Sequence, residues 1–173
     1  MKPILIATFG YPGSGKTYFS EKLAGDLNCA HLRSDDFRFR IIPKPTFSNE
    51  EHTMVFGLID FLAEKFLSNG VNVVYDVNLT KKRHRDRVRR IADNTNSHFV
   101  LISIETPFEI AVQRAKDREL HSIDRRTVEA ISDEYEDLSS ETYIKIDGLK
   151  TYDEQKDIIL KQISDKTKNG AVS

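Results

Sequence analysis

Short apolar runs alternate along the chain with longer stretches in which apolar residues recur every three or four positions. The short runs predict strands, at residues 3–9, 30–34, 71–76, 98–104 and 142–146. The longer stretches predict helices, because residues three and four apart share one helix face. This alternation predicts an α/β fold in three layers, α/β/α, with a five-stranded parallel sheet covered by helices on both faces.

Three of the predicted helices have recognisable start signals. Residues 48–51 (Ser-Asn-Glu-Glu) form a capping box before a helix that Gly70 ends. Residues 106–109 (Thr-Pro-Phe-Glu) supply a cap, a proline at the first helical position and an acid in the first turn. Residues 151–154 (Thr-Tyr-Asp-Glu) open the last helix in the same way.

Size and composition indicate one globular domain. We expect it to span residues 1–165 of the 173, with the polar residues 166–173 as a tail. The net charge of −1 gives the chain no overall signature of nucleic-acid binding. The single cysteine, Cys29, excludes an internal disulfide, and no zinc cluster is present in the sequence. Neither a membrane-length apolar run nor an apolar leader is seen, so we expect a cytoplasmic protein without a membrane partner.

The strongest functional motif follows the first predicted strand directly. Residues 10–17 read Gly-Tyr-Pro-Gly-Ser-Gly-Lys-Thr and match the phosphate-binding loop G-x-x-x-x-G-K-[ST]. Phe19, Leu23 and Leu27 follow at helical spacing, so the motif lies between a strand and a helix. The alternative is a glycine-rich turn that matches by chance, and the flanking elements argue against it.

The chemistry of this loop predicts a nucleoside triphosphate as partner, with ATP and Mg²⁺ as the expected cofactors. Its glycines let backbone N–H groups converge on phosphate oxygens at a helix N-terminus. The Lys16 ammonium can bridge the β- and γ-phosphates, and the Thr17 hydroxyl can ligate Mg²⁺. No motif that reads the base is visible in the sequence. The residues expected at the nucleotide are Gly10, Pro12, Gly13, Ser14, Gly15, Lys16, Thr17 and Tyr18.

Carboxylates follow the second and third predicted strands, at the sheet edge where ligands of such folds bind. Asp35 and Asp36 come after the second strand, and one of them can act as general base on an acceptor hydroxyl. The alternative is that one of them caps the next helix. Asp76 ends the third strand and can hold Mg²⁺ through water or orient a cation. Its neighbour Val77 replaces the glutamate that many ATPases use to activate water, which favours transfer to an acceptor over hydrolysis.

Two arginines, Arg114 and Arg118, are spaced i, i+4 and are expected on one face of a helix. A mobile segment here can close over ATP and neutralise charge on the transferred phosphoryl group. The alternative is an ordinary solvated helix surface.

A basic helix is predicted after the third strand, where residues 81–90 hold seven lysines or arginines. His84, Val88, Ile91 and Ala92 share its core face, and the positive side chains, Arg85 among them, are expected to cover most of the rest. Such a surface can bind a phosphodiester backbone. The alternative is a solvated face that pairs with acidic neighbours, for which the candidates are Asp133, Glu134, Glu136 and Asp137.

The order of these motifs resembles the kinase domain of phage polynucleotide kinase and its relatives, which include zeta-toxin-like and chloramphenicol-phosphotransferase-like kinases. The resemblance rests on residues 10–17, on D-D-F-R at 35–38, on D-V-N-L at 76–79 and on R-x-x-x-R at 114–118. It implies a P-loop NTPase fold with a helical lid, and transfer of the γ-phosphate of ATP to a hydroxyl. Ser34 and residues 40–49 depart from the family pattern, and the phosphatase domain of the bifunctional relative is not in this sequence.

The resemblance also implies roles for individual residues. Asp35 would be the base, Arg38 would bind a phosphate of the acceptor, and Asp76 would orient Arg38 or help at the metal. Arg114 and Arg118 would form the lid and act with Lys16 in catalysis. The residues expected around the acceptor are Asp36, Arg38, Asp76 and Asn78.

The acceptor itself is predicted less closely. The favoured hypothesis is a nucleic-acid 5′-hydroxyl, bound by Arg38 and the basic helix at 81–90. A small-molecule, antibiotic or sugar-nucleotide kinase would keep the same ATP machinery and change the acceptor wall, to which Phe56 and Phe61 are candidate contributors. A more distant alternative is a non-catalytic switch that binds ATP and regulates a partner.

Overall fold

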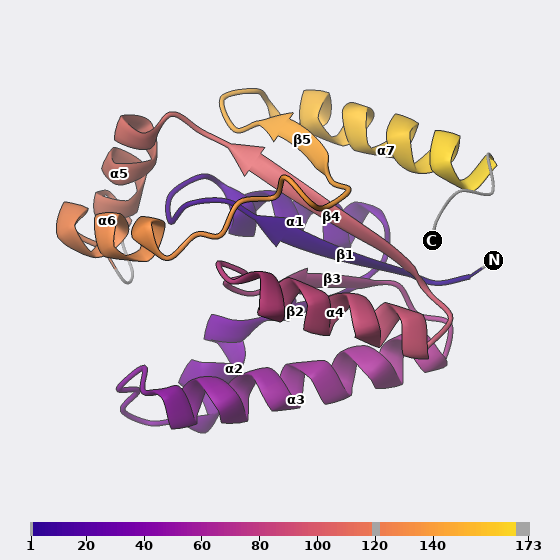
Figure 1. Cartoon of the computed structure of the whole chain (residues 1–173), viewed down its shortest axis with the longest axis horizontal. Coiled ribbons are helices and arrows are strands. Elements are labelled where there is room, and N and C mark those ends of the chain that lie inside the picture. Colours follow the sequence, from indigo (N-terminus) through magenta and orange to yellow (C-terminus); the bar gives the residue numbers. More distant parts are fainter. Residues whose placement is uncertain (1, 119–121, 169–173) are drawn as a thin grey trace.

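Five parallel strands form one sheet in the order β2-β3-β1-β4-β5, and all five were predicted (Figure 1). The computed structural model describes residues 2–118 and 122–168. The strands are β1 Ile4–Phe9, β2 Ala30–Arg33, β3 Val73–Asp76, β4 His98–Glu105 and β5 Ile144–Asp147. Because β1 lies between β3 and β4, the segments that follow β1, β3 and β2 meet at one edge of the sheet.

Helices cover both faces of the sheet, which confirms the predicted three layers. They are α1 Lys16–Asp26, α2 Ser34–Ile41, α3 Asn49–Ser68, α4 Lys82–Asn94, α5 Phe108–Lys116, α6 Arg125–Asp133 and α7 Tyr152–Lys168. Helices α3 and α4 build the core on one face, and α1 and α7 build it on the other. Helices α5 and α6 lie beyond the carboxyl ends of the strands (Figure 1).

Helix capping follows the sequence in two of the three predicted places. The Ser48 hydroxyl accepts from the Glu51 N–H, and the Thr151 hydroxyl accepts from the Glu154 N–H. The third prediction is wrong: α5 has Pro107 as its N-cap, and no side chain caps it. Thr106 instead donates its hydroxyl to the carbonyl of Ser14 in the phosphate-binding loop, 3.0 Å away.

The C-terminal helix α7 continues to Lys168, into the stretch predicted as a tail; residues 169–173 lie outside the described part of the chain. Across residues 2–118 and 122–168, every helix is too short or too polar to cross a membrane.

Arg85 is part of the core, which corrects its predicted place on the exposed face of the basic helix. The side chain is fully buried and donates from Nε to Glu141 at 2.6 Å. Its other nitrogens donate to main-chain carbonyls of Leu79, Thr80 and Asp137 at 2.9–3.0 Å. Glu141 and Asp137 belong to residues 134–143, a segment between α6 and β5 that we call the strap (Figure 1). The strap passes over Arg85, so a position that was expected in water lies in the interior.

Removing the buried carboxylate should destabilise the fold. We expect Glu141→Ala to lower the free energy of unfolding by about 2 kcal/mol, because a buried guanidinium loses its counter-charge while its carbonyl acceptors remain. Urea denaturation measures this, with Glu134→Ala, an exposed carboxylate just after α6, as control. Equal stability of the two variants would show that the Arg85–Glu141 pair contributes nothing net.

Candidate active site

The phosphate-binding loop joins β1 to α1 in the geometry that its glycines predict. Gly10, Gly13 and Gly15 all have positive φ, and a Cβ on Gly13 would lie 2.0 Å from the Ala111 carbonyl of α5. No side chain caps the start of α1. The N–H groups of its first turn are therefore available to phosphate oxygens, in the field of the helix dipole.

Lys16 lies at the centre of the site. Its ammonium donates to the carbonyls of Gly10 and Tyr11 in the loop, the latter at 2.9 Å. Burial lowers the pKa of Lys16 to about 8; Asp76 opposes this shift, Arg118 adds to it, and Asp35 opposes it more weakly. Three of the predicted site residues thus lie within electrostatic reach of the loop lysine.

The two carboxylates of α2 differ in their surroundings. Arg33 is the N-cap of α2 and no side chain caps the helix, so the capping alternative for the aspartates is wrong. Asp36 is 53% exposed and pairs with Arg33 at 3.4 Å. Asp35 is half-buried and acts electrostatically on both Lys16 and His52. Asp35 is therefore near enough to the phosphate-binding loop and to α3 to influence a residue of each, while Asp36 pairs on the surface.

Asp76, at the end of β3, is 5% exposed. Its Oδ2 lies 3.4 Å from Nε2 of His31, a residue the sequence did not single out, and this oxygen has no hydrogen-bond partner. Thr17 lies half-buried in the first turn of α1, and Asn78 is exposed in the segment that follows β3.

An unpaired carboxylate oxygen and a hydroxyl beside the loop are hard donors that fit Mg²⁺. Within residues 2–118 and 122–168 there is no cluster of three or more His, Cys, Asp or Glu that could cage a metal. Thr17 and Asp76 would therefore hold the ion together with phosphate oxygens and water. When bound, Mg²⁺ neutralises charge on the transferred phosphoryl group.

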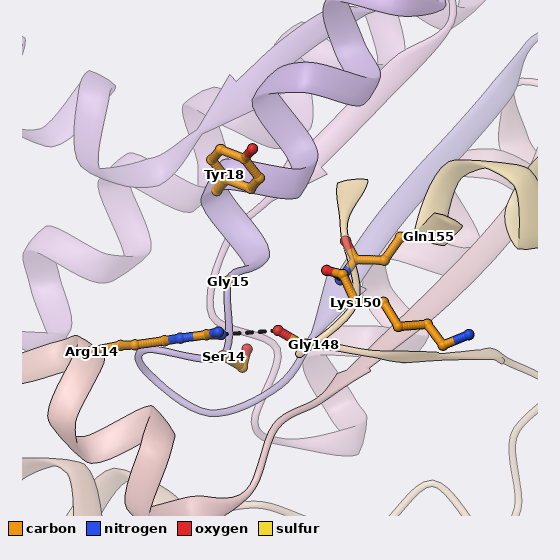
Figure 2. Close-up of a pocket in the computed structure, with 7 residues that line it drawn as sticks. All are labelled: Ser14, Gly15, Tyr18, Arg114, Gly148, Lys150 and Gln155. Carbon is orange, nitrogen blue, oxygen red and sulfur yellow. Dashed lines mark hydrogen bonds between the residues drawn. The ribbon is translucent and has the colours of Figure 1, made fainter. Parts of the chain in front are cut away.

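A cavity of about 270 Å³ opens beside the phosphate-binding loop (Figure 2). Arg114 spans it, and its guanidinium donates to the Gly148 carbonyl at 3.0 Å. A Cβ on Gly148 would lie 1.9 Å from the Thr106 hydroxyl, so only glycine fits this close approach. No sequence motif predicted this contact. The lining residues are Ser14, Gly15, Tyr18, Arg114, Gly148, Lys150 and Gln155.

Arg118 and Arg114 do not share one helix. α5 ends at Lys116, so Arg118 lies two residues beyond it, exposed. The expectation of one common helix face is wrong, because α5 ends two residues before Arg118. Arg114 contacts Gly148 at the cavity, whereas Arg118 acts electrostatically on Lys16.

Arg38 is 2% exposed and is held by α3. Its guanidinium donates to Glu51 at 3.1 Å, contacts Nδ1 of His52 at 2.9 Å and stacks on the Phe47 ring at 4.8 Å. Asp76 lies against His31, and the groups that hold the Arg38 guanidinium, Glu51 and His52, belong to α3, so α3 orients Arg38. Its Nε is buried without a hydrogen-bond partner.

Two histidines, one on α3 and one on α4, lie against the Phe56 ring near Arg38. The His52 ring lies 5.5 Å from the Phe56 ring, which lies 6.3 Å from His84. Burial lowers the pKa of both imidazoles, with Arg38 adding to the effect at His52 and Arg87 at His84. Phe56 thus lies among candidate acceptor groups, whereas Phe61 is 53% exposed.

Glu51 should give the protein a pH-dependent stability. Hydrogen bonds from Thr46, with help from Phe47 and Arg38, lower the pKa of Glu51 from 4.5 to about 2. A lowered pKa means that the native state favours the carboxylate, so this contribution is complete above pH 4.5 and is lost as the pH falls through about 2. We expect Glu51→Gln to flatten the acid limb of the stability curve in that window, measured by urea denaturation. Glu64→Gln, elsewhere on α3, is the control; an unchanged acid limb in Glu51→Gln would contradict the assignment.

The basic helix α4 uses much of its charge within the molecule. Besides Arg85, three of its basic residues pair with carboxylates: Lys82 with Asp86 at 2.7 Å, Arg87 with Asp60 at 3.0 Å and Arg89 with Glu141 at 3.7 Å. The alternative that these basic residues pair with carboxylates of the same chain is confirmed. The partners are mostly other carboxylates than those named from the sequence. Among the four acidic residues named from the sequence, Glu136 accepts from the Lys82 N–H, and Asp137 contributes a main-chain carbonyl to Arg85.

Comparison with known proteins identifies the family of this chain. A family model described as an AAA domain, AAA_33, matches residues 5–138. A probable adenylyl-sulfate kinase from Aeropyrum pernix is 29% identical over 118 residues, which are 65% of this chain and 64% of that relative. The chain therefore spans slightly less than two thirds of the length of this curated relative.

Solved structures share the fold. A gluconokinase from Sinorhizobium meliloti 1021 superposes with a TM-score of 0.72 at 17% identity, covering 97% of this chain and 95% of the other. A chain of the Pnkp1/Rnl/Hen1 RNA repair complex superposes with a TM-score of 0.67 at 20% identity, covering 76% of this chain and 43% of the other. These likenesses show the fold alone, so the specific resemblance to polynucleotide kinase stays a prediction. The chain belongs to the AAA_33 family and has the P-loop motif and the fold of a P-loop NTPase.

Proposed function

We propose that this protein transfers the γ-phosphoryl group of ATP to a hydroxyl of a small acceptor that carries an anionic group. The observation that carries the proposal is the position of Asp35, within electrostatic reach of both Lys16 and His52. A general base for an acceptor hydroxyl is needed close to both the phosphate-binding loop and the groups that bind the acceptor, for which the buried Arg38 is the candidate.

The donor side follows from the P-loop. The first turn of α1 and Lys16 bind the phosphates, and the cavity beneath Arg114 receives the nucleoside. In the transfer, a bond forms between the acceptor oxygen and the γ-phosphorus, and the bond from that phosphorus to the β,γ-bridging oxygen breaks to leave ADP. Asp35 takes the hydroxyl proton, and Arg114 and Arg118 stabilise charge on the moving group.

The acceptor side follows from Arg38. A buried guanidinium with an unpaired Nε, fixed by Glu51 and His52, is a preorganised partner for a carboxylate, sulfate or phosphate. Phe47 and Phe56 add apolar surface beside it. The relative named as an adenylyl-sulfate kinase and the structural neighbour named as a gluconokinase are both named for acceptors of this chemical kind.

A nucleic-acid 5′-hydroxyl is the second candidate. The exposed side chains of Arg83 and Arg90 on α4 and the likeness to a chain of an RNA repair complex favour it. It ranks second because four of the seven basic residues at 81–90 pair with carboxylates of this chain, which leaves less charge for a phosphodiester backbone.

The test is a transfer assay with γ-labelled ATP and Mg²⁺. Acceptors are offered in pairs that differ in an anionic group, adenylyl sulfate against adenosine and gluconate against glucose, beside a 5′-hydroxyl oligonucleotide. We expect label on an anionic small molecule and not on its neutral partner, and loss of that label in Asp35→Asn.

Arg38→Lys should raise KM for the acceptor more than it lowers kcat, because a lysine keeps the charge and loses the fixed geometry. Label on the oligonucleotide, falling steeply with salt, would instead establish the second candidate. ATP binding without transfer to any acceptor would favour a regulatory switch.

A further inference from the structure

The strap, which follows α6, is hydrogen-bonded to the phosphate-binding loop. Tyr135, in the first turn after α6, donates its hydroxyl to the carbonyl of Gly10, 125 positions earlier in the chain. The next residue, Glu136, donates its N–H to the Thr80 carbonyl at 2.9 Å, in the segment that follows β3. Tyr135 is thereby fixed between the phosphate-binding loop and the segment that carries Asn78.

Aromatic contacts hold the ring of Tyr135 in this position. It meets the Phe9 ring edge-on at 4.9 Å and the Tyr11 ring at 5.1 Å. Tyr11 in turn meets Phe108 of α5 edge-on at 5.8 Å. These rings form a continuous packed row from β1 to α5, and the ring contacts do not depend on the tyrosine hydroxyl.

The Gly10 carbonyl accepts two hydrogen bonds, one from Tyr135 and one from the Lys16 ammonium. Both lone pairs of this oxygen are therefore used, in a residue that is buried. An ammonium that turns toward a bound phosphate weakens its bond to the carbonyl. A buried carbonyl left without any partner would oppose that movement.

We propose that Tyr135 is a positioning residue for Lys16: its hydroxyl keeps the Gly10 carbonyl paired and so lets the lysine engage the phosphates of ATP. The inference rests on the proposed function in one respect, that Lys16 binds these phosphates. It adds that the strap contributes to nucleotide affinity without contacting the nucleotide.

The variant that isolates this role is Tyr135→Phe, which keeps the ring contacts and removes the hydroxyl. Binding of ATP and of adenosine is measured by calorimetry, which requires no acceptor. We expect the Kd for ATP to rise about tenfold, the effect of one buried polar group losing its partner, and the Kd for adenosine to stay the same. Tyr143→Phe is the matched control, because Tyr143 lines a second cavity together with Tyr135 and should leave both affinities unchanged.

A double-mutant cycle with Lys16→Ala separates this role from general packing. Without the ammonium, no hydrogen bond from Lys16 to the Gly10 carbonyl weakens when ATP binds. Tyr135→Phe should therefore change the Kd for ATP less than about twofold in that background. Equal losses in both backgrounds, an equal loss for adenosine, or wild-type affinity in Tyr135→Phe would each overturn the inference and leave the kinase proposal standing. Failure of the wild-type protein to bind ATP would overturn the kinase proposal and this inference with it.

Discussion

Replacing Lys16 with alanine should reduce phosphoryl transfer about 10³-fold or more while the fold persists. The ammonium is the one charged group placed on the loop itself, and Asp35, Asp76 and Arg118 all lie within its electrostatic reach. Its lowered pKa means that the native state disfavours the charged lysine, so the loss of this charge removes a cost of folding as well as two hydrogen bonds.

The measurement is the rate of transfer from γ-labelled ATP to the acceptor that the assay identifies, with circular dichroism and thermal unfolding to verify the fold. Lys22→Ala is the matched control, since Lys22 lies on the same helix and contacts the Tyr18 and Tyr152 rings. A rate within tenfold of wild type in Lys16→Ala would mean that the loop does not serve catalysis as proposed.

Replacing Asp35 with asparagine should slow the chemical step about 10²-fold or more and leave ATP affinity nearly unchanged. Asparagine keeps the size of the side chain and loses the ability to take a proton. Because Asp35 acts electrostatically on both Lys16 and His52, we expect the loss to fall where the acceptor hydroxyl is oriented.

Asp36→Asn is the built-in control for this change. Its carboxylate is 53% exposed and pairs with Arg33 on the surface, so we expect transfer rates within about twofold of wild type. Single-turnover rates at saturating ATP distinguish the two variants. A greater sensitivity of Asp36 would reverse the assignment of the base.

The sequence predicted those features that depend on neighbours along the chain. The five strands follow from short apolar runs, and the phosphate-binding loop follows from glycines next to a strand. The Ser48 cap is likewise a contact between residues three positions apart.

The features that were missed depend on partners far away in the chain. Arg85 was expected in water because it is charged, and it is buried because Glu141, 56 residues later, neutralises it. Thr106 was assigned to the nearest helix, yet its hydroxyl bonds to Ser14, 92 residues earlier. Neither His52 nor Tyr135 belongs to a local motif, and both become visible only when the sheet brings α3 and the strap to the loop.

The attachment of Arg38 to α3 also bears on how acceptor specificity can change in proteins of this architecture. Glu51 accepts from Arg38 and Phe47 at Oε2 and from Thr46 at Oε1, so α2, the loop that follows it and α3 share one carboxylate. A graft that changes the path of this loop alone would withdraw these main-chain donors from Glu51, the carboxylate that also holds Arg38. Engineering a new acceptor preference should therefore exchange residues 34–52 as one cassette, and natural divergence in acceptor choice is expected to proceed by the same block.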